Sequence, residues 1–327
     1  MYKELFDSFK NLNILIIGDV MIDAYLWGKV DRISPEAPVP IVSVNKKESR
    51  LGGAANVALN IKALNAQPII CAIVGDDKEG EELMSLLAKE NISNVGIVKL
   101  HHRQTTVKTR VIGHNQQILR IDAETDVEIS PSETNLVLNK FHQILTDTKI
   151  HAIIFEDYDK GLITNQLIEA VIAIAKEKAI PVVVDPKKRN FLAYKNVDVF
   201  KPNLKELKEG LKIDFDPKNL PDLQNAVTLL KNKINAKNII VTLSELGIYA
   251  LNDVEGQLTP AHIRNVADVS GAGDTVISVI ATCIAAGADI FTAAKLGNLA
   301  GGIVCEKVGV VPVNKDLLLQ EALKNYG

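Results

Sequence analysis

The stretch Ile14-Leu-Ile-Ile-Gly-Asp19 shows the pattern that decides the fold, an uninterrupted apolar run that ends at a polar residue. Continuous runs rich in β-branched residues favour strands that are buried on both faces, as in a parallel sheet. Five further runs of this kind follow along the chain: Ile69–Val74, Ala152–Phe155, Pro181–Val184, Val197–Phe200 and Ile239–Leu243. We therefore predict a parallel sheet at the centre of the molecule.

Segments with helical periodicity lie between many of these runs. They are Ala54–Asn65, Lys78–Glu90, Glu133–Leu145, Asn165–Lys178 and Asp222–Ile234, and two more close the chain near Asp289–Glu306 and Lys315–Asn325. Strands that alternate with helices predict a doubly wound α/β fold with a mostly parallel sheet. We expect residues 1–327 to form a single domain of this class.

Two segments break the alternation. Asp23–Val44 contains three prolines and no helical period, and Thr105–Asp122 alternates as two strands around the turn signal Gly113-His-Asn-Gln116. We expect these segments, approximately residues 20–45 and 105–122, to form a small β sheet beside the main one. Because ligands of such folds bind outside the carboxyl ends of the strands, this sheet could serve as a lid.

The composition excludes several classes of partner. With 47% hydrophobic residues and a formal net charge of −3, the chain can bury a sizeable core but has no basic surface for nucleic acid. The longest apolar run, Val276–Ala288, is too short to cross a bilayer. Cys71, Cys283 and Cys305 lie far apart in apolar runs, as reduced thiols do. We therefore expect a cytoplasmic protein without a membrane partner.

The stretch Asp268-Val-Ser-Gly-Ala-Gly-Asp-Thr275 predicts an anion site at the start of a helix. Gly271, Ala272 and Gly273 can form a tight turn there, where backbone N–H groups and the helix dipole favour a negative charge. A carboxylate beside a bound phosphate is costly unless it accepts a proton, so Asp274 indicates phosphoryl transfer to a hydroxyl with Asp274 as general base. The alternative is an Asp that only caps the helix.

Acidic or amide residues follow several predicted strands. They are Asp19 and Asp23 after the first, Glu156 and Asp157 after Ala152–Phe155, Asp185 after Pro181–Val184, and Asn203 and Glu206 after Val197–Phe200. Parallel strands end at the same edge of a sheet, so these residues predict a shared polar crevice. Glu206 follows Asn203 by three residues and is a candidate to organise Mg²⁺, directly or through water. The alternative is that the two form a helix cap.

Two further stretches hold candidate binding residues, each with a structural alternative. The pair of glycines in Leu51–Asn56 permits close approach of a ligand, and Asn56 can bond to a sugar hydroxyl, or the stretch only opens a helix. In Val241–Gly247, hydroxyl groups at a strand end could contact ATP phosphates, or form a plain strand–turn. The chain has no Walker A sequence, and Gly271-x-Gly273 lacks the third glycine of a dinucleotide site, which argues against NAD.

Taken in order, these motifs resemble the signature of the ribokinase-like (PfkB) carbohydrate kinases. The matching pieces are Gly52-Gly53-Ala54-x-Asn56, Asn203-x-x-Glu206 and Asp268-x-x-Gly271-Ala272-Gly273-Asp274. Their order and separation match across nearly the whole chain. The resemblance implies a ribokinase-like fold, ATP and Mg²⁺ as cofactors, and a small-molecule sugar substrate.

The resemblance also implies roles by position. Asp274 would deprotonate the sugar hydroxyl, and the backbone of residues 271–273 would hold the γ-phosphoryl group. Asn203 and Glu206 would organise phosphate and Mg²⁺. The nucleotide would be bound by Thr242, Ser244, Gly247 and Asn298, and the sugar by Asp19, Asp23, Gly52, Gly53 and Asn56. Lys108, Arg110, Lys160 and Lys187 are the candidates for a phosphate on the substrate, because charge-assisted contacts are strong.

A narrower set of motifs looks like the heptose kinase branch of this family. The motifs are Gly18–Asp23, Ser34–Pro40, Asn115–Gln117, Asp157-Tyr158-x-Lys160-Gly161 and Asp185-Pro186-Lys187. This likeness implies phosphorylation of the C1 hydroxyl of D-glycero-β-D-manno-heptose 7-phosphate, a step of ADP-heptose and lipopolysaccharide core biosynthesis. The branch is often fused to a nucleotidyltransferase, but the chain lacks a His-x-Gly-His signature. We therefore expect either that a separate protein supplies that activity or that the chain is a fragment of a bifunctional protein.

Other readings stay open. A kinase of fructose 6-phosphate or tagatose 6-phosphate would share the fold, although Ser34–Pro40 favours the heptose branch. An inactive sugar-binding regulatory protein is disfavoured by Asp274 and Glu206. Family members often form dimers through the lid, and Trp27 and Val39 would suit such a homodimer.

Overall fold

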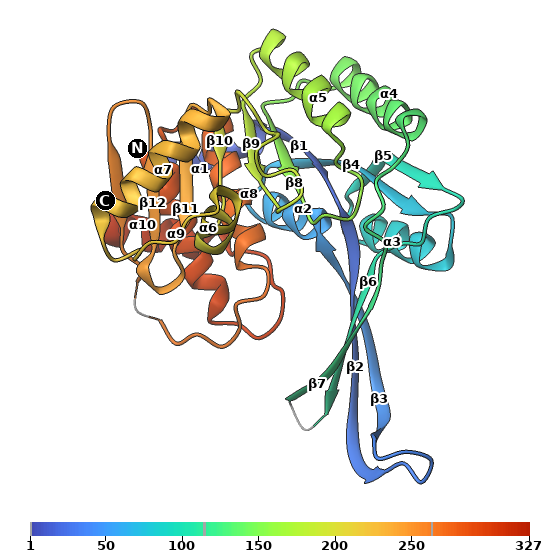
Figure 1. Ribbon diagram of the computed structural model, residues 1–327. Helices are drawn as coiled ribbons and strands as arrows, with labels where there is room; N and C mark the ends of the chain where they lie inside the picture. The colour runs from blue at the N-terminus through green and yellow to red at the C-terminus, as the bar shows by residue number, and fades with distance from the viewer. Residues whose placement is uncertain (1, 114–115, 263) are drawn as a thin grey trace.

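The computed structural model describes residues 2–113, 116–262 and 264–327, and its centre is a nine-stranded sheet (Figure 1). Its order is β13-β12-β11-β10-β9-β8-β1-β4-β5. The strands are β1 Asn13–Gly18, β4 Gln67–Gly75, β5 Ser93–Leu100, β8 Ala152–Glu156, β9 Val182–Asp185, β10 Val199–Phe200, β11 Asn238–Thr242, β12 Ile248–Leu251 and β13 Gly256–Thr259. Strands β11 to β5 pair in parallel, and β12 and β13 add an antiparallel edge.

Helices pack on this sheet in groups. They are α1 Tyr2–Ser8, α2 Ala54–Ala63, α3 Lys78–Lys89, α4 Pro131–Asp147, α5 Asn165–Glu177, α6 Leu204–Leu211, α7 Leu220–Ile234, α8 Ala272–Ala285, α9 Ile290–Cys305 and α10 Lys315–Tyr326, with short 3-10 turns at Phe9–Asn11 and Ser244–Leu246. Helix α8 packs between α2 and α9 and against β8 and β9, whereas α4 packs on α5, β4 and β5. The predicted doubly wound fold is confirmed.

The predicted strands and helices are all present, with shifted ends. Strand Val197–Phe200 shortens to β10, and helix Asp222–Ile234 begins two residues earlier because Pro221 suits the first helical turn. The sequence analysis missed β5, β12 and β13. Three of the first four β5 residues are exposed and all but the last of β13 are, so neither forms the continuous apolar run on which the predictions were based.

The second sheet contains β2 Val20–Ile33, β3 Pro40–Gly53, β6 Val107–Gly113 and β7 Gln116–Ala123, in the order β3-β2-β6-β7. Strands β2 and β6 pair in parallel, and the outer pairs are antiparallel. Figure 1 shows this sheet projecting from the body of the molecule as a long arm. The predicted sheet is therefore present, and β3 extends to Gly53. His114 and Asn115 of the predicted turn lie outside the described residues.

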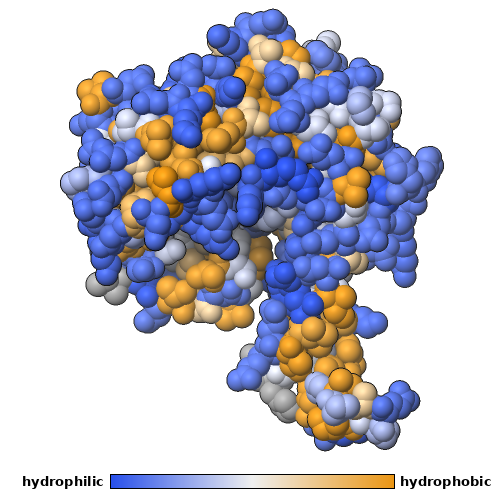
Figure 2. Space-filling model, in the orientation of Figure 1, coloured by the Kyte–Doolittle hydropathy of each residue, from blue (hydrophilic) through white to orange (hydrophobic). Residues whose placement is uncertain are grey.

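The two faces of this arm differ in chemistry. Leu26, Val111 and Leu119 are register partners and share one face, because side chains alternate along each strand. Leu119 and Ile121 are 53% and 51% exposed, and Figure 2 shows the apolar surface that gathers on the arm. Tyr25, Arg110 and Arg120 are register partners on the opposite, charged face.

Trp27 lies on the charged face, because it follows Tyr25 by two residues and stacks on its ring at 6.1 Å between centroids. This position separates Trp27 from the apolar face, and its expected part in a dimer through the lid stays a prediction. Val39, by contrast, is exposed at the turn between β2 and β3.

Two expectations from composition also have structural counterparts. Cys71, Cys283 and Cys305 are free, and the first two are buried. Among the described residues, no helix is long and apolar enough to cross a membrane.

Candidate active site

The carboxyl ends of the central strands bring the predicted polar residues to one edge of the sheet. Gly18, Glu156 and Asp185 are register partners at the ends of β1, β8 and β9. Asn203 follows β10 and bridges to Thr242 at the end of β11. The first turn of α8 lies at the same edge, where a Cβ on Gly273 would lie 4.0 Å from Asp185 Oδ2 and meet nothing nearer. The predicted gathering of polar residues at one edge of the sheet is therefore present, and a crevice that binds ligand there stays a prediction.

Asp274 is buried in the first turn of α8, and each of its oxygens accepts a hydrogen bond from another element. The Tyr158 hydroxyl donates to Oδ1 at 2.7 Å, and Asn56 Nδ2 donates to Oδ2 at 2.7 Å. Burial raises the pKa of Asp274 to about 6, although these two hydrogen bonds oppose the rise. A carboxylate with this pKa can take up a proton near neutral pH.

The turn before α8 has the form that the motif predicted. Gly271 precedes the helix with a φ of 77°, a left-handed conformation that favours glycine. The helix start has no side-chain cap, so Asp274 does not serve as one and the capping alternative is wrong. The Gly273 N–H belongs to the first turn, where helices leave donors suited to an anion, whereas the Ala272 N–H donates to the Val269 carbonyl oxygen at 3.3 Å.

Asn203 and Glu206 form a capping box at the start of α6. The Asn203 side chain accepts from the Glu206 N–H, and Glu206 Oε2 accepts from the Asn203 N–H, both at 2.8 Å. The structural alternative for this motif is therefore confirmed. Glu206 Oε1 also accepts from Lys187 Nζ at 2.7 Å, which places a cation beside the same carboxylate.

Lys187 is a cation of the site on which two carboxylates act, those of Asp185 and Glu206. Burial opposes its charge, but the carboxylates of Asp185 and Glu206 outweigh burial and raise the pKa of Lys187. Its ammonium lies 5.4 Å from the ring centroid of Tyr158, a cation–π distance. Lys187 thus connects the capping box of α6 with the residue that bonds to Asp274.

Asp19 holds a loop. Its carboxylate accepts from the backbone N–H groups of Tyr158, Lys160 and Leu162 at 2.9, 3.1 and 3.4 Å. This loop carries Tyr158 towards Asp274, so Asp19 positions the site. A sugar contact by Asp19, as expected from the sequence, would have to compete with these bonds.

The glycine pair is required by close packing. Gly53 has a φ of 58°, and a Cβ there would lie 2.4 Å from the Asp19 carbonyl oxygen. A Cβ on Gly52 would lie 2.4 Å from Asp23 Oδ2. The tight-packing alternative is confirmed for both glycines, and their expected contact with sugar stays a prediction.

Asn56 is 1% exposed, and its amide group is used to hold Asp274. Asn60, one turn further along α2, accepts from Thr275 Oγ1 at 3.1 Å and from the Val313 N–H at 2.9 Å. A polar seam therefore joins α2 to α8. Sequence reasoning missed Asn60 and Tyr158 as site residues, because their partners lie more than 100 positions away.

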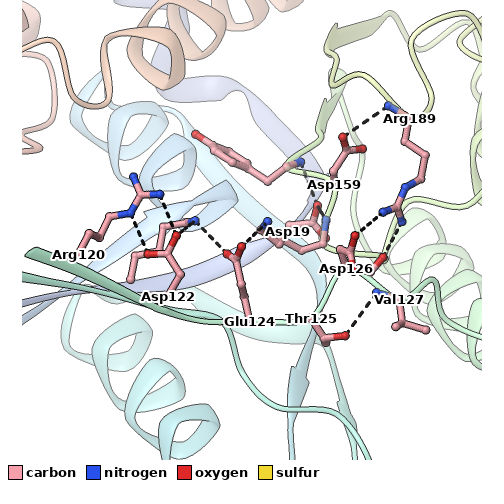
Figure 3. Close-up of polar contacts among 12 residues, drawn as sticks. Asp19, Arg120, Asp122, Glu124, Thr125, Asp126, Val127, Asp159 and Arg189 are labelled. Carbon is pink, nitrogen blue, oxygen red and sulfur yellow. Dashed lines mark hydrogen bonds and ion pairs between the residues drawn. The ribbon is translucent and has the colours of Figure 1, made fainter.

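The cations predicted to bind a substrate phosphate are all paired with carboxylates. Arg110 forms an ion pair with Asp23, and its guanidinium lies 5.5 Å from the Tyr25 ring centroid. Lys108 and Lys160 each lie 2.9 Å from Glu124, which they share. Figure 3 shows this row from Arg120 through Asp122 to Glu124 and Asp19.

The residues predicted to bind nucleotide lie at and beyond the carboxyl end of β11, and their contact with nucleotide stays a prediction. Ser244 is exposed and follows β11, and Gly247 has a φ of 98° where a Cβ would lie 2.1 Å from the Thr259 carbonyl oxygen. Asn298 Nδ2 donates to the Pro260 carbonyl oxygen at 2.8 Å. Gly247 and Asn298 therefore hold the same segment, Thr259–Pro260, while Thr242 adjoins Asn203.

Glu156 is a buried acid at the middle of this edge. It is 1% exposed, and its Oε2 atom has no hydrogen-bond partner among the described residues. Burial, together with the neighbouring Asp185 and Asp274, holds the pKa of Glu156 well above its usual range. Asp185 is also buried but lies 2.9 Å from Lys201 Nζ. Glu156 therefore favours its neutral form.

Two other features do not belong to this edge. A hollow of about 500 Å³ lies beside Val182 and Ala236, at the amino ends of β9 and β11, where sheets of this type do not bind their ligands. No group of three or more His, Cys, Asp or Glu side chains in the described part of the chain forms a metal site.

Comparison with known proteins agrees with this geometry. The sequence model of the pfkB family carbohydrate kinases matches residues 11–316. Similar curated proteins are both named bifunctional protein HldE: one from Sulfurimonas denitrificans, 41% identical over 92% of the chain, and one from Campylobacter jejuni, 42% identical over 95%. The chain spans 62% and 65% of the lengths of these relatives.

Solved structures share the fold at low sequence identity. Phosphofructokinase-2 from Escherichia coli has a TM-score of 0.76 at 20% identity and covers 95% of this chain and 97% of its own. Ribokinase from Arabidopsis thaliana, complexed with ribose and ATP, has a TM-score of 0.72 at 16% identity and covers 94% and 99%.

Glu156→Gln should raise the melting temperature by about 2–4 °C at pH 8 and leave it nearly unchanged at pH 5. The folded-state pKa of Glu156 is raised, so the unfolded chain releases this proton at lower pH than the folded protein does. Stability is therefore lost as the pH rises above the ordinary glutamate pKa, and Gln avoids that loss. Thermal melts across this pH range test the idea, with exposed Glu255→Gln as the control. Equal shifts at both pH values would contradict it.

Proposed function

Because the chain belongs to the pfkB family of carbohydrate kinases, we propose that it transfers the γ-phosphoryl group of ATP to a hydroxyl of a sugar phosphate, with Asp274 as general base. The observation that carries this proposal is the Asp274 carboxylate, buried beside the glycine turn at the start of α8. An anion-binding turn and a base with a pKa of about 6 at one place meet the two needs of phosphoryl transfer.

In the proposed reaction, Asp274 accepts the proton of the attacking hydroxyl. The backbone of residues 271–273 and the dipole of α8 stabilise negative charge on the transferring group. The nucleotide lies over Thr242, Ser244 and Gly247, at the carboxyl end of β11. Catalysis of this kind depends on position and charge stabilisation, because the protein forms no covalent bond with the phosphoryl group.

Glu206 fits an outer-shell role towards Mg²⁺ better than direct coordination. Both of its oxygens already accept hydrogen bonds, from the Asn203 N–H and from Lys187. Mg²⁺ retains waters and is commonly held by nucleotide phosphates with few protein ligands, which Glu206 and Asn203 would orient. The ion would neutralise charge on the phosphates.

For the acceptor, we propose D-glycero-β-D-manno-heptose 7-phosphate, phosphorylated at its C1 hydroxyl. The heptose-branch motifs at Ser34–Pro40 and Asp157–Gly161 support this choice, as does the likeness to proteins named HldE. Asp23 and the backbone of Gly52 and Gly53 lie close together and would contact the sugar. Fructose 6-phosphate is the runner-up, since the fold is shared with a phosphofructokinase.

A cluster of three cations beside the lid favours a phosphorylated acceptor. Lys108, Lys160 and Arg120 are held by only two carboxylates, those of Asp122 and Glu124. Within this cluster three cations share two carboxylates, so a phosphate bound at the cluster would meet an excess of one positive charge. A substrate phosphate would balance this charge and gain charge-assisted hydrogen bonds.

Asp274→Asn should leave ATP binding nearly intact and lower kcat by about 10²–10⁴. In the native protein, activity should fall as the pH drops below about 6, because the base is then protonated. Calorimetric titration of ATP and steady-state rates measure the two effects. Near-normal turnover of the variant would remove Asp274 from the mechanism.

Phosphorus NMR should show ADP and a heptose 1,7-bisphosphate when the protein is given ATP and the heptose 7-phosphate. Lys160→Gln should raise KM for this substrate by about tenfold or more, because a charged contact is lost. The matched control is Lys99→Gln on β5, which removes the cation of a surface ion pair with Glu81 of α3. Preference for fructose 6-phosphate would overturn the heptose assignment and leave the kinase proposal in place.

We also propose that two copies associate through the apolar face of the lid. Leu119→Asp with Ile121→Asp should halve the mass measured by light scattering, because charges cannot be buried without partners. Val254→Asp is the control, since Val254 is 90% exposed at the distant β12–β13 turn. A native protein that is already monomeric at micromolar concentration would contradict the proposal.

A further inference from the structure

Among the residues that the structure describes, Tyr158 contacts both the Asp274 carboxylate and the Lys187 ammonium. Its hydroxyl donates to Asp274 Oδ1, and the face of its ring lies 5.4 Å below the Lys187 ammonium. Its backbone N–H is fixed by Asp19 Oδ2 at 2.9 Å. The backbone N–H and the hydroxyl of Tyr158 are therefore both hydrogen-bonded, and the hydroxyl is directed at Asp274.

We propose that Tyr158 is a positioning residue of the kinase reaction, whose hydroxyl keeps the Asp274 carboxylate charged and oriented for the attacking hydroxyl. This inference rests on the proposed role of Asp274 as base. The step is a simple proton balance: the acceptor hydroxyl loses its proton to Asp274, and Tyr158 keeps its own proton throughout.

The surroundings of Asp274 explain why such a donor is needed. The cation Lys187 lies against the Tyr158 ring. Three acids oppose the charge on Asp274: Asp185 from β9, Asp23 from β2 and, on the neighbouring strand, Glu156 from β8. These acids and burial all oppose the negative charge of the Asp274 carboxylate. Helix α2 contributes only the neutral amide of Asn56. The hydrogen bond from Tyr158 therefore provides a large part of the stabilisation of the charged Asp274 carboxylate.

The ring of Tyr158 separates this role from a purely structural one. Lys187 lies against the ring, and Tyr158→Phe would keep that contact while it removes only the hydroxyl. Loss of the hydrogen bond to the charged form of Asp274 favours its protonated form. The acid limb of the kcat profile should then move up by roughly one pH unit, which lowers kcat about fivefold at pH 6 and less than twofold at pH 9.

Tyr194→Phe is the matched control. The Tyr194 hydroxyl is buried and donates to Asp157 Oδ2 at 2.7 Å, so the variant loses a hydrogen bond of the same kind and length. It should leave the pH profile unchanged. A second variant with the opposite sign replaces Tyr158 by 3-fluorotyrosine, whose more acidic hydroxyl is a stronger donor. It should move the acid limb to lower pH.

Titration of ¹³C-labelled aspartate by NMR, with the Asp274 signal identified by its loss in Asp274→Asn, gives a readout independent of activity. An upward shift of this titration in Tyr158→Phe, with a matching shift of the kcat profile, supports the inference. An unchanged titration, or a loss of kcat that is equal at all pH values, overturns it. A shifted titration in Tyr158→Phe, together with an active Asp274→Asn variant, would support the Tyr158–Asp274 hydrogen bond and refute the role of Asp274 as general base.

Discussion

Burial of the Asp274 carboxylate is the constraint on which the rest of the site depends. A buried charge is costly unless hydrogen bonds stabilise it, and here two donors from distant segments do so, Asn56 from α2 and Tyr158 from the loop after β8. Each donor is itself held: Asn56 by the packing of α2 on α8, and Tyr158 by Asp19 at the end of β1. The acid therefore organises three elements around one helix start.

The same edge of the sheet concentrates acids and matches them incompletely with cations. Lys201 pairs with Asp185 and Lys187 pairs with Glu206, whereas Glu156 has an oxygen without a partner. Buried ion pairs of this kind contribute little net stability compared with apolar packing. Their presence fits a site that has to handle phosphate and protons better than it fits a need for stability.

The lid extends this arrangement beyond the sheet. Side chains alternate along its strands, which places Arg110 and Arg120 on one face and Leu119 and Ile121 on the other. Its long strand β2 begins near the site, where it carries Asp23, and β3 ends there at Gly52–Gly53. A single sheet can thus serve a charged ligand on one side and an apolar partner on the other.

The sequence by itself determined six of the nine strands of the main sheet, most of the helices and the edge at which the polar residues meet, because buried strands and helix periods depend on local patterns such as Ile14–Ile17. It also located Asp274 and the glycine turn. Only the tertiary structure decided which side chains bond to one another: that Asn56 and Tyr158 hold Asp274, that Asp19 supports a loop, and that Glu206 caps a helix while it pairs with Lys187. Those contacts join residues up to 218 positions apart, and no local pattern carries information over such a separation.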